Sequence, residues 1–365
     1  MKKFYYIAEI NLPTSSAYAL HVLKMCDAFA ELKYDVELIV YYKKKNLNFN
    51  IIKKKYNLKN NFRIKALFKN RKNFNFFDRC KLAFYANKKI YNKNLVISRS
   101  VISSLFLSLN KKMNILEIHH DLQGLTSFIF RLKKNFLSKK YLKFILINKK
   151  LNKILSISKN ESIILDDAVD LRDFDKVKVK VLDGCVYTGS FTKGKGLEII
   201  GKLAELNPNI KFNIYGDKKY LNIKNRSYIH KKNINLYDYQ EYRKIPGILK
   251  QNKILLMPYQ NKVFGRGTNL ELVNYMSPMK MFDYLASGRI IIASDLKVYS
   301  HILKNNFNAF LVKTNDIKMW NKILRLIYFS PIKKYIKINK NARKTIENYT
   351  WVKRAHKIIN FDKHR

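Results

Sequence analysis

The sequence predicts an α/β protein of two domains, each built around a parallel β-sheet. Three observations lead to this fold class. The length of 365 residues exceeds what one core of ordinary size needs, so two domains are expected. Hydrophobic residues make up 47% of the chain and charged residues 27%, which is the composition of a globular protein. Short apolar runs alternate with amphipathic helical stretches, and that alternation is typical of βαβ units.

The first βαβ unit occupies the N-terminal region. Residues 3–10 are strand-like, residues 17–32 place apolar side chains at helical spacing, and residues 35–42 form a second strand-like run. Strands joined through a helix are expected to pair in parallel. Ligands of such sheets lie beyond the carboxyl ends of the strands, so the loop that ends in Ser15 and Ser16 is a candidate cleft wall. A capped helix start without any further role explains this loop equally well.

The same alternation continues along the rest of the chain. Further strands are predicted at residues 95–98, 114–118, 142–147, 153–158, 185–188, 211–215, 227–230, 254–258 and 290–293. Further helices are predicted at residues 80–91, 100–109, 197–206, 239–249, 279–286 and 338–359. The alternating segment VKVKVLD starts a new block, so the domain boundary is expected at residues 175–180. The predicted domains are therefore residues 1–178 and 179–344.

The chain is strongly basic, with a net charge of +47 from 73 Lys and Arg residues against 26 Asp and Glu residues. A field of this sign favours polyanions such as nucleic acid, an anionic membrane or phosphorylated substrates. Lysine is abundant even in segments expected to be core, so most of it is attributed to a compositional bias, with a membrane-facing excess above it. Residues 43–79 interleave basic and aromatic side chains. This segment suits an anionic membrane surface, single-stranded nucleic acid or a merely solvated insertion, and the membrane is preferred over nucleic acid.

The cysteines and the apolar runs indicate in which cellular compartment the protein is expected. Cys26, Cys80 and Cys185 are odd in number and lack any C-x-x-C or Cys/His ligand spacing, which favours a reduced, cytoplasmic compartment without a zinc site. The N-terminus imitates a signal peptide for a few residues, but Glu9 interrupts its apolar run, so a buried first strand explains it better. No apolar run approaches the ~20 residues of a membrane span, so any membrane contact is expected to be peripheral.

Residues 275–295 carry the first candidate ligand site, in a turn, a helix, a second turn and an apolar strand. Pro278 supplies a helix-compatible φ at the first turn, and Ser277 before it is positioned to cap a free amide. The N-terminus of this helix is therefore expected to hold a phosphate, while Asp283 reaches a hydroxyl-rich group nearby. A nucleotide sugar has both features.

A second candidate lies in the segment GSFTKGKG, residues 189–196. Gly189, Gly194 and Lys195 match the P-loop pattern, but Gly196 occupies the position of the Mg²⁺-binding hydroxyl, so the metal part of the pattern fails. The glycines are expected to let backbone amides approach a diphosphate, and Lys195 is expected to neutralise it.

A third candidate is the strand end at residues 117–121, EIHHD. A carboxylate and two imidazoles at the mouth of a parallel sheet form a plausible element of a reaction centre. Neighbouring residues on a strand point to opposite faces, so metal binding by the pair is disfavoured and one of His119 and His120 is expected to face the cleft. The acidic residues 166–173 have the composition of a divalent-ion site, but loop capping near the domain boundary is preferred for them.

Taken together, these residues resemble the GT-B-fold glycosyltransferases of the group 1 kind, carbohydrate-active family 4. The resemblance rests on SPMKMFDYLASGRIIIASD and YTGSFTKGKG, with weaker support from EIH, DAVDL and TWVKRA. It implies two Rossmann-like domains that face a central cleft, and a C-terminal helix, about residues 345–362, that crosses back to the N-terminal domain. It also implies a metal-independent transfer that retains the anomeric configuration. No cofactor is expected, since the nucleotide-diphosphate sugar is the donor substrate.

The resemblance also assigns residues. Asp283 matches the Glu that binds the ribose hydroxyls, whereas Tyr275 replaces the first Glu of that motif. Lys195 matches the phosphate-binding lysine, and His119 the histidine that contacts the donor sugar. The remaining donor-binding positions are expected to act through backbone amides or the glycine-rich turn, and they are Gly189, Ser190, Ser277, Pro278, Met279 and Lys280. Ser190 stands where an arginine is common in the family.

The expected function is transfer of a hexosyl group from a nucleotide sugar to a glycan or lipid-linked hydroxyl acceptor in cell-surface glycan synthesis. Ser15, Ser16 and His120 are the acceptor-side candidates. The expected location is the cytoplasm, with the inner face of the plasma membrane as a peripheral partner, and no nucleic acid is expected to bind. Two alternatives stay open. One is a nucleotide-sugar epimerase of related fold, and the other is a non-enzymatic basic module that binds membrane or nucleic acid.

Overall fold

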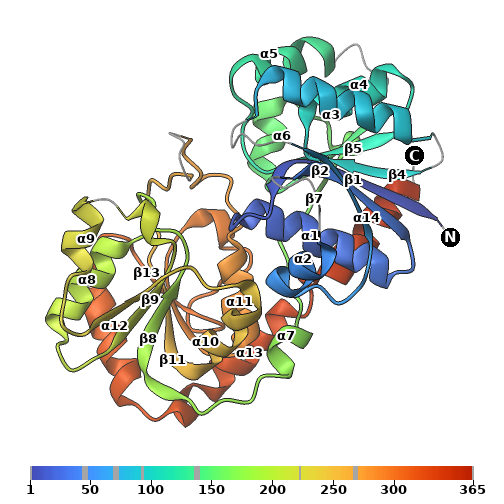
Figure 1. Ribbon diagram of the computed structural model, residues 1–365. Helices are drawn as coiled ribbons and strands as arrows, with labels where there is room; N and C mark the ends of the chain where they lie inside the picture. The colour runs from blue at the N-terminus through green and yellow to red at the C-terminus, as the bar shows by residue number, and fades with distance from the viewer. Residues whose placement is uncertain are drawn as a thin grey trace. The chain divides into compact units, whose positions relative to one another are not determined.

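The computed structural model describes residues 2–42, 48–68, 74–91, 94–134, 140–221, 223–265 and 270–363. The chain divides into two compact units, each with a parallel sheet covered by helices on both faces (Figure 1). Unit 1 contains residues 1–167 and 351–365, and unit 2 contains residues 168–350. The predicted α/β class with two parallel-sheet domains is confirmed.

Unit 1 is built on seven parallel strands, which are β1 (Lys3–Leu12), β2 (Asp35–Tyr42), β3 (Arg63–Phe68), β4 (Leu95–Ser98), β5 (Asn114–Ile118), β6 (Leu142–Leu146) and β7 (Ser162–Ile164). Their order across the sheet is β3-β2-β1-β4-β5-β6-β7. The central strands are apolar at consecutive positions because helices cover both faces. The carboxyl ends of β1, β4 and β5 therefore meet at one edge of the sheet.

The helices of unit 1 are α1 (Ala17–Glu31), α2 (Phe49–Tyr56), α3 (Phe76–Lys89), α4 (Val101–Leu109), α5 (Gly124–Lys133), α6 (Lys149–Leu155) and α14 (Trp351–Lys363). Helices α3, α4 and α5 lie together on one side of the sheet, and α1, α2 and α14 lie on the other (Figure 1). Side-chain caps begin several of them, as when Ser16 accepts a hydrogen bond from the Ala19 amide at 3.2 Å.

Unit 2 contains six parallel strands, β8 (Leu182–Thr188), β9 (Phe212–Tyr215), β10 (Ile234–Tyr237), β11 (Asn252–Met257), β12 (Ile290–Ser294) and β13 (Phe310–Val312). They lie in the order β10-β9-β8-β11-β12-β13. Its helices are α7 (Arg172–Asp175), α8 (Leu197–Leu206), α9 (Ile223–Ile229), α10 (Ile245–Gln251), α11 (Met279–Ser287), α12 (Ile317–Phe329) and α13 (Ile336–Ile346). Two apolar cores flank the sheet: Leu256 and Ile292 face α8 and α12, whereas Leu255 and Ile291 face α11.

The chain passes from unit 1 to unit 2 after Asp167 and returns to unit 1 after Thr350. The expected boundary lay at residues 175–180, but α7 places Phe174 in a core of unit 2, so the division falls earlier along the chain. The C-terminal helix α14 packs on α1 in unit 1, with Ala355 and Ile358 fully buried. Helix α13 remains with unit 2.

Two predicted strands are wrong. Residues 153–155 belong to α6, which Asn148 caps by accepting from the Lys150 amide at 2.7 Å, and the strand follows at β7. Residues 227–229 belong to α9, and the strand is β10. In both places a β-branched apolar turn of a short helix was read as a strand, because segments of this length carry no helical period.

The basic segment at residues 43–79 is an ordinary part of unit 1 where the structure describes it. Residues 43–47 and 69–73 lie outside the described residues. Between them, α2 buries Ile52 and Tyr56, and β3 pairs with β2. A solvated insertion is therefore ruled out for residues 48–68. Within the described parts of the chain, no helix has the length and apolar character needed to cross a membrane.

Candidate active site

The N-terminus of α11 is the first feature of the candidate site in unit 2. Pro278 occupies the N-cap position with φ −75° and ψ 115°, and no side chain forms a capping hydrogen bond there. Ser277 is therefore not the N-cap residue that was predicted, since Pro278 holds that position, one residue before the first turn in which it was expected. The positive end of the helix dipole and the amides of its first turn are left without a side-chain cap.

Lys280 extends from the first turn of α11 into protein rather than solvent. Its Nζ is buried and has no hydrogen-bond partner among the described residues. It lies 3.8 Å from the centroid of the Tyr187 ring and 5.2 Å from that of Tyr259. Burial, with a smaller effect of the charge of Lys195, holds the pKa of Lys280 well below its ordinary value. The Lys195 ammonium lies 4.8 Å from the same Tyr259 ring, so two lysines converge on one aromatic wall.

Gly189 and Ser190 follow β8 and close over the Lys280 side chain. A Cβ atom at Gly189 would lie 2.5 Å from Lys280 Nζ, and the backbone φ is +153°, so a side chain at this position would be strained and would displace the Lys280 amine. The Ser190 carbonyl accepts a hydrogen bond from the Tyr187 hydroxyl at 2.8 Å. The Tyr284 hydroxyl accepts from the Thr188 amide at 3.0 Å and so ties α11 to the end of β8. The glycine-rich turn and α11 therefore form one cluster.

Gly194 and Gly196 of the turn are required for a different reason from the one predicted. A Cβ at Gly194 would lie 1.8 Å from the Lys262 carbonyl oxygen, and one at Gly196 would lie 1.9 Å from that of Pro258. The space beside them is filled by the chain that follows β11, not left for a diphosphate. The backbone confirms this close packing, since the Gln260 amide donates to the Gly194 carbonyl at 2.9 Å. Their role is to let two backbone segments touch.

Asp283 lies one turn beyond Lys280 and is 8% exposed. Its Oδ1 accepts a hydrogen bond of 2.8 Å from the hydroxyl of Tyr242, which precedes α10. Tyr275 is half-buried in the turn before α11, where its amide donates to the Leu272 carbonyl at 2.9 Å. Met279 is half-buried at the first position of the helix. The assignment of Asp283 to a ribose stays a prediction.

A buried polar network occupies the carboxyl-end edge of the unit 1 sheet. At its centre is Glu117 on β5, whose side chain is fully buried. Glu117 Oε1 lies 2.7 Å from the Arg354 guanidinium and 2.9 Å from Nε2 of both His21 and His119. The Tyr6 hydroxyl donates to the other carboxylate oxygen. Although burial opposes ionisation, the charges of Arg354 and His21 hold the pKa of Glu117 well below its ordinary value.

His119 has one nitrogen engaged by this carboxylate. Burial, together with the charge of Arg99, lowers the pKa of His119 to about 3, so the ring is neutral near neutral pH. Because Glu117 is ionised, the proton of the neutral ring is on Nε2, which donates to the carboxylate at 2.9 Å. Nδ1 is then an acceptor, the form that receives a hydrogen bond from a hydroxyl group. The side chain of His119 is 14% exposed.

The acceptor-side candidates lie elsewhere on unit 1. His120 is exposed, and its Nδ1 lies 2.8 Å from the Asp121 carbonyl oxygen. Ser16 is the N-cap of α1, which is the structural alternative considered for that loop, and Ser15 beside it is half-buried. Their roles toward an acceptor stay predictions.

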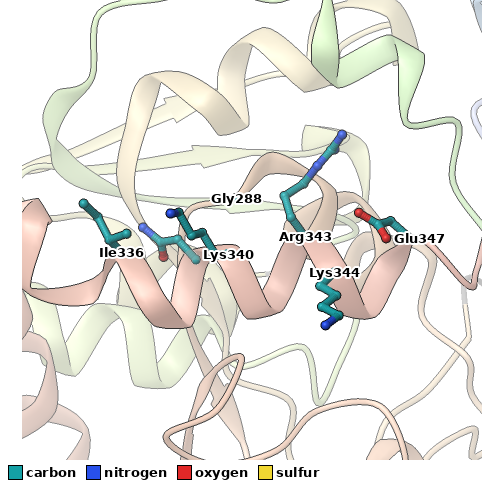
Figure 2. A pocket seen from close by; sticks show the side chains of 7 residues that line it. Gly288, Ile336, Lys340, Arg343, Lys344 and Glu347 are labelled. Carbon is teal, nitrogen blue, oxygen red and sulfur yellow. The ribbon is translucent and has the colours of Figure 1, made fainter.

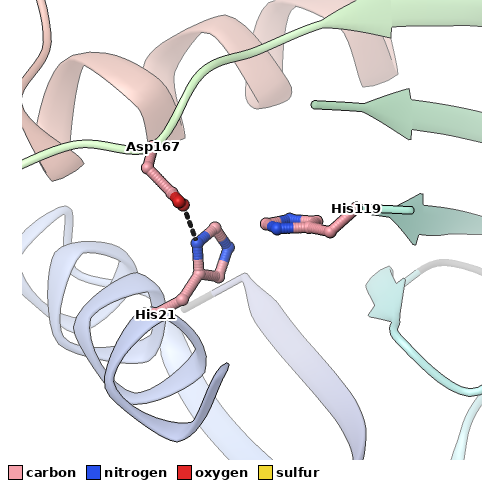
Figure 3. A group of neighbouring side chains, drawn as sticks. All are labelled: His21, His119 and Asp167. Atoms are coloured by element: carbon pink, nitrogen blue, oxygen red, sulfur yellow. Dashed lines mark hydrogen bonds and ion pairs between the residues drawn. The ribbon is translucent and has the colours of Figure 1, made fainter. Parts of the chain in front are cut away.

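His21, His119 and Asp167 bring three metal-ligand atoms within 4.8 Å of one another (Figure 3). His21 Nδ1 is bound to Asp167 Oδ1 at 2.5 Å, while His119 is bound to Glu117. The rings of the two histidines are perpendicular, with centroids 4.8 Å apart. These side chains are held by one another and lie beside the positive charge of Arg354. The arrangement orients His119 and is a poor one for a cation.

A separate cavity of about 650 Å³ runs along α13 beside Gly288 (Figure 2). Gly288 ends α11 with a φ of 63°, so the cavity lies at the carboxyl end of that helix, opposite Lys280. The negative end of the helix dipole does not favour a phosphate. Arg343 on its wall donates to the Ala286 carbonyl at 2.7 Å and has a structural role.

Sequence reasoning missed three members of these clusters. His21 stands on the buried face of α1, where its spacing is that of a core residue. Arg354 was noted only as part of a terminal motif, yet it is 4% exposed and pairs with Glu117 across most of the chain. Lys280 was expected to contribute its backbone amide, whereas its ammonium is the group that reaches Gly189. A basic residue in the first turn of a helix, where acidic ones are preferred, was the available signal for Lys280.

Comparison with known proteins agrees with this architecture. Residues 183–345 match the family described as "Glycosyl transferases group 1". Three similar solved structures are a glycosyltransferase from Rickettsia africae ESF-5 (15% identity, TM-score 0.75), Alr3699/HepE from Anabaena in complex with UDP-glucose (10%, 0.73), and S. aureus TarM in complex with fondaparinux, alpha-GlcNAc-glycerol and UDP (13%, 0.73). The alignments cover 99 or 100% of each chain. No curated protein sequence matches.

The two parallel-sheet units define the GT-B fold of glycosyltransferases, as these structures show. Within that class, residues 183–345 match the group 1 glycosyltransferases, which confirms the group 1 part of the resemblance read from the sequence motifs. The assignment to carbohydrate-active family 4 stays a prediction.

Proposed function

We propose that this group 1 glycosyltransferase transfers a sugar from a nucleotide-diphosphate sugar to a hydroxyl acceptor, with retention of the anomeric configuration. The observation that carries the proposal is the buried Lys280 amine, which lacks a hydrogen-bond partner among the described residues at the N-terminus of α11 and shares an aromatic wall with Lys195. Two lysines and a helix N-terminus form a site for a diphosphate.

Sugar transfer requires the protein to stabilise the negative charge that develops on the departing nucleotide diphosphate. Preorganised positive groups do this without a metal, and Lys195 and the α11 amides are such groups. His119, neutral and with Nδ1 as an acceptor, is suited to a hydroxyl of the donor sugar. The leaving phosphate then takes the proton of the acceptor hydroxyl as that oxygen attacks from the same face.

The donor and acceptor classes are proposed from related structures. Alr3699/HepE is solved with UDP-glucose, and TarM with UDP and alpha-GlcNAc-glycerol. We therefore take a UDP-hexose as the first donor to test and a glycan or lipid-linked glycan of the cell surface as the acceptor class.

The test is calorimetric binding of UDP-glucose, GDP-mannose and ADP-glucose to the full chain. One of them is expected to bind, and Lys195→Ala is expected to weaken that binding by about tenfold or more, since it removes a charge-assisted contact. Lys202→Ala, on the exposed face of α8, is the matched control and should bind like wild type. If none of the three binds, and a polynucleotide binds with strong salt dependence, the proposal is wrong.

The epimerase alternative needs a carboxyl group that exchanges a proton. In the strand end at residues 117–121 the carboxyl groups available for this are those of Glu117 and Asp121, and Glu117 is fully buried and held ionised by Arg354. It therefore lacks the accessibility and the pKa of an acid–base catalyst. The other candidate, Asp121, lies 3.9 Å from the Arg131 guanidinium, so it is engaged in an ion pair.

We also propose that unit 1 binds the surface of an anionic membrane through α3 and α5. Apolar side chains repeat at helical spacing on the exposed faces of these helices, and they are Phe76, Phe77, Phe84, Leu125, Phe128 and Leu132. Phe77 is 80% exposed and Phe128 is 61% exposed. The helices are joined by the hydrogen bond from Arg79 to Thr126 at 3.1 Å. Exposed lysines on α3, at positions 81, 88 and 89, complement anionic headgroups.

Vesicle flotation tests this surface. The full chain is expected to float with vesicles of phosphatidylglycerol and phosphatidylcholine, and to stay behind with phosphatidylcholine alone. The double variant Phe77→Ser, Phe128→Ser should lose most of the binding to vesicles, because it removes two apolar rings that would be buried in the lipid. Phe329→Ser, which removes a phenylalanine 65% exposed on α12 in unit 2, is the control. Equal flotation of all three proteins would exclude α3 and α5 as the docking surface.

A further inference from the structure

The surroundings of the Lys280 amine are unusual for a lysine side chain. It faces the rings of Tyr187 and Tyr259 and the backbone of Gly189, and the charged side chain that acts on it is another cation, Lys195. On its own helix, Asp283 accepts a hydrogen bond from Tyr242 and Tyr284 is bound at Thr188. Arg343, from α13, contacts the far end of α11. Among the described residues, no carboxylate forms a hydrogen bond with the buried Lys280 Nζ.

A lysine amine in this position lacks an anionic hydrogen-bond acceptor among the described residues. Burial and Lys195 both favour its neutral form, and nothing nearby offsets them. A diphosphate at the N-terminus of α11 would supply negative charge and hydrogen-bond acceptors beside the amine. Both effects favour the ammonium form, and they act in a site where water does not screen them.

The turn after β8 leaves space for the Lys280 side chain. Ser190 has a short neutral side chain at the position where the resemblance places an arginine, so Lys195 is the one cation that the turn is proposed to bring to the diphosphate. Gly189 leaves room for a side chain from another element, and Lys280 fills that room from α11. The second cation of the site thus comes from the helix, and it is an amine whose charge depends on its surroundings.

We infer that Lys280 takes up a proton from solvent when the donor diphosphate binds, and that the ammonium so formed holds the diphosphate during sugar transfer. The inference rests on the proposed function and concerns the same site. The proton returns to solvent when the nucleotide diphosphate leaves, so the lysine is unchanged over one cycle. Donor affinity should therefore fall as the pH rises above the pKa of the free-site amine, by up to about tenfold per pH unit for one linked proton.

The experiment is calorimetry of UDP-glucose binding to the full chain at one pH in PIPES, HEPES and Tris buffers. The dependence of the observed enthalpy on buffer ionisation enthalpy gives the number of protons taken up. GDP-mannose or ADP-glucose takes the place of UDP-glucose if it is the donor that binds. Each phosphate of such a donor carries one ester bond and one anhydride bond, so neither has an ionisation near neutral pH that would add to the proton count. Wild type is expected to take up close to one proton at pH 7.5.

Three variants separate the possible outcomes. Lys280→Met should bind about tenfold or more weakly and take up no proton. Lys280→Arg should take up no proton in whatever donor binding it retains, because a guanidinium is charged already. Lys202→Met should match wild type in both quantities. Equal proton uptake by wild type and Lys280→Met would overturn the inference while leaving nucleotide-sugar binding intact. Failure of all three donors to bind wild type would instead overturn the proposed function.

Discussion

The hydroxyl of Tyr242 donates a 2.8 Å hydrogen bond to Asp283 and joins the segment before α10 to the middle of α11. Both groups are buried, and burial together with the carboxylate holds the pKa of Tyr242 well above its ordinary value. The pair fixes the direction of the carboxylate that the resemblance assigns to the ribose. Its orientation is therefore set before any ligand arrives.

Asp283→Asn should separate a ribose contact from a phosphate contact. If the carboxylate binds ribose hydroxyls, the variant loses about tenfold in affinity for UDP but keeps its affinity for pyrophosphate, because only UDP carries the sugar. Competition binding of the two ligands measures this. Tyr242→Phe, which keeps the carboxylate and loses one hydrogen bond, should cost about 1 kcal/mol of stability and change affinity less. An equal loss for both ligands in Asp283→Asn would contradict the ribose assignment.

Arg354→Met should destabilise unit 1 by about 3–5 kcal/mol, because it leaves the buried carboxylate of Glu117 without its cation. Urea unfolding followed by circular dichroism measures the change. Lys357→Met on the exposed face of α14 removes the same charge without a buried partner and should change stability by less than about 0.5 kcal/mol. Similar losses in the two variants would mean that the Glu117–Arg354 pair has no special role.

Acid should destabilise the protein in part through His119. The folded ring has a pKa of about 3, whereas the unfolded ring titrates near its ordinary value of 6.5. Between these values the unfolded state binds the extra proton, so stability falls with falling pH by about 1.4 kcal/mol per unit. Glu117 and Asp167, whose pKa values are lowered, contribute stability above their ordinary range that is lost below about pH 4.

His119→Gln should therefore flatten the stability profile between pH 6.5 and about 4.5, since glutamine keeps a donor toward Glu117 but does not titrate. Urea unfolding at several pH values gives the slopes. His356→Gln, on the exposed face of α14, is the control and should keep the wild-type slope. Parallel profiles for all three proteins would show that His119 is not the linked group.

Gly196→Ala should cost about 2–4 kcal/mol, because φ is +84° and the new methyl group would lie 1.9 Å from the Pro258 carbonyl oxygen. Gly247→Ala is the matched control in α10, where nothing lies within 4 Å of the added Cβ, and it should stabilise by about 0.5–1 kcal/mol. Thermal unfolding of both variants tests the packing role of the turn. A Gly196→Ala protein as stable as wild type would mean that the turn and the chain after β11 separate easily.

The sequence allowed the sheets to be predicted because their strands are continuous apolar runs. β4 and β5 begin and end at the expected residues, and α8 does so as well. Short elements failed where one turn of helix and one short strand look alike, as at residues 153–158 and 227–230. Length was the missing information there, since a helical period needs more residues than these segments contain.

The sequence allowed the location of the candidate sites to be predicted, but not the side-chain contacts within them. The motifs located the N-terminus of α11 and the turn after β8, yet the approach of Lys280 to Gly189 joins residues far apart in the chain. His21 was hidden because a histidine on the buried face of α1 has the spacing of a core residue. Pairing of Glu117 with Arg354 spans 237 positions, and periodicity carries no information at that range.

The return of α14 to unit 1 has a consequence for synthesis. A ribosome completes every strand of the seven-stranded sheet before it begins unit 2, and Glu117 is enclosed in that sheet early. Arg354, which neutralises it, emerges only after the whole of unit 2 has been made. The first unit to be translated is thus the last to be finished, and in the nascent chain the Glu117 carboxylate has His21, His119 and Tyr6 as partners but lacks its arginine until the final helix arrives.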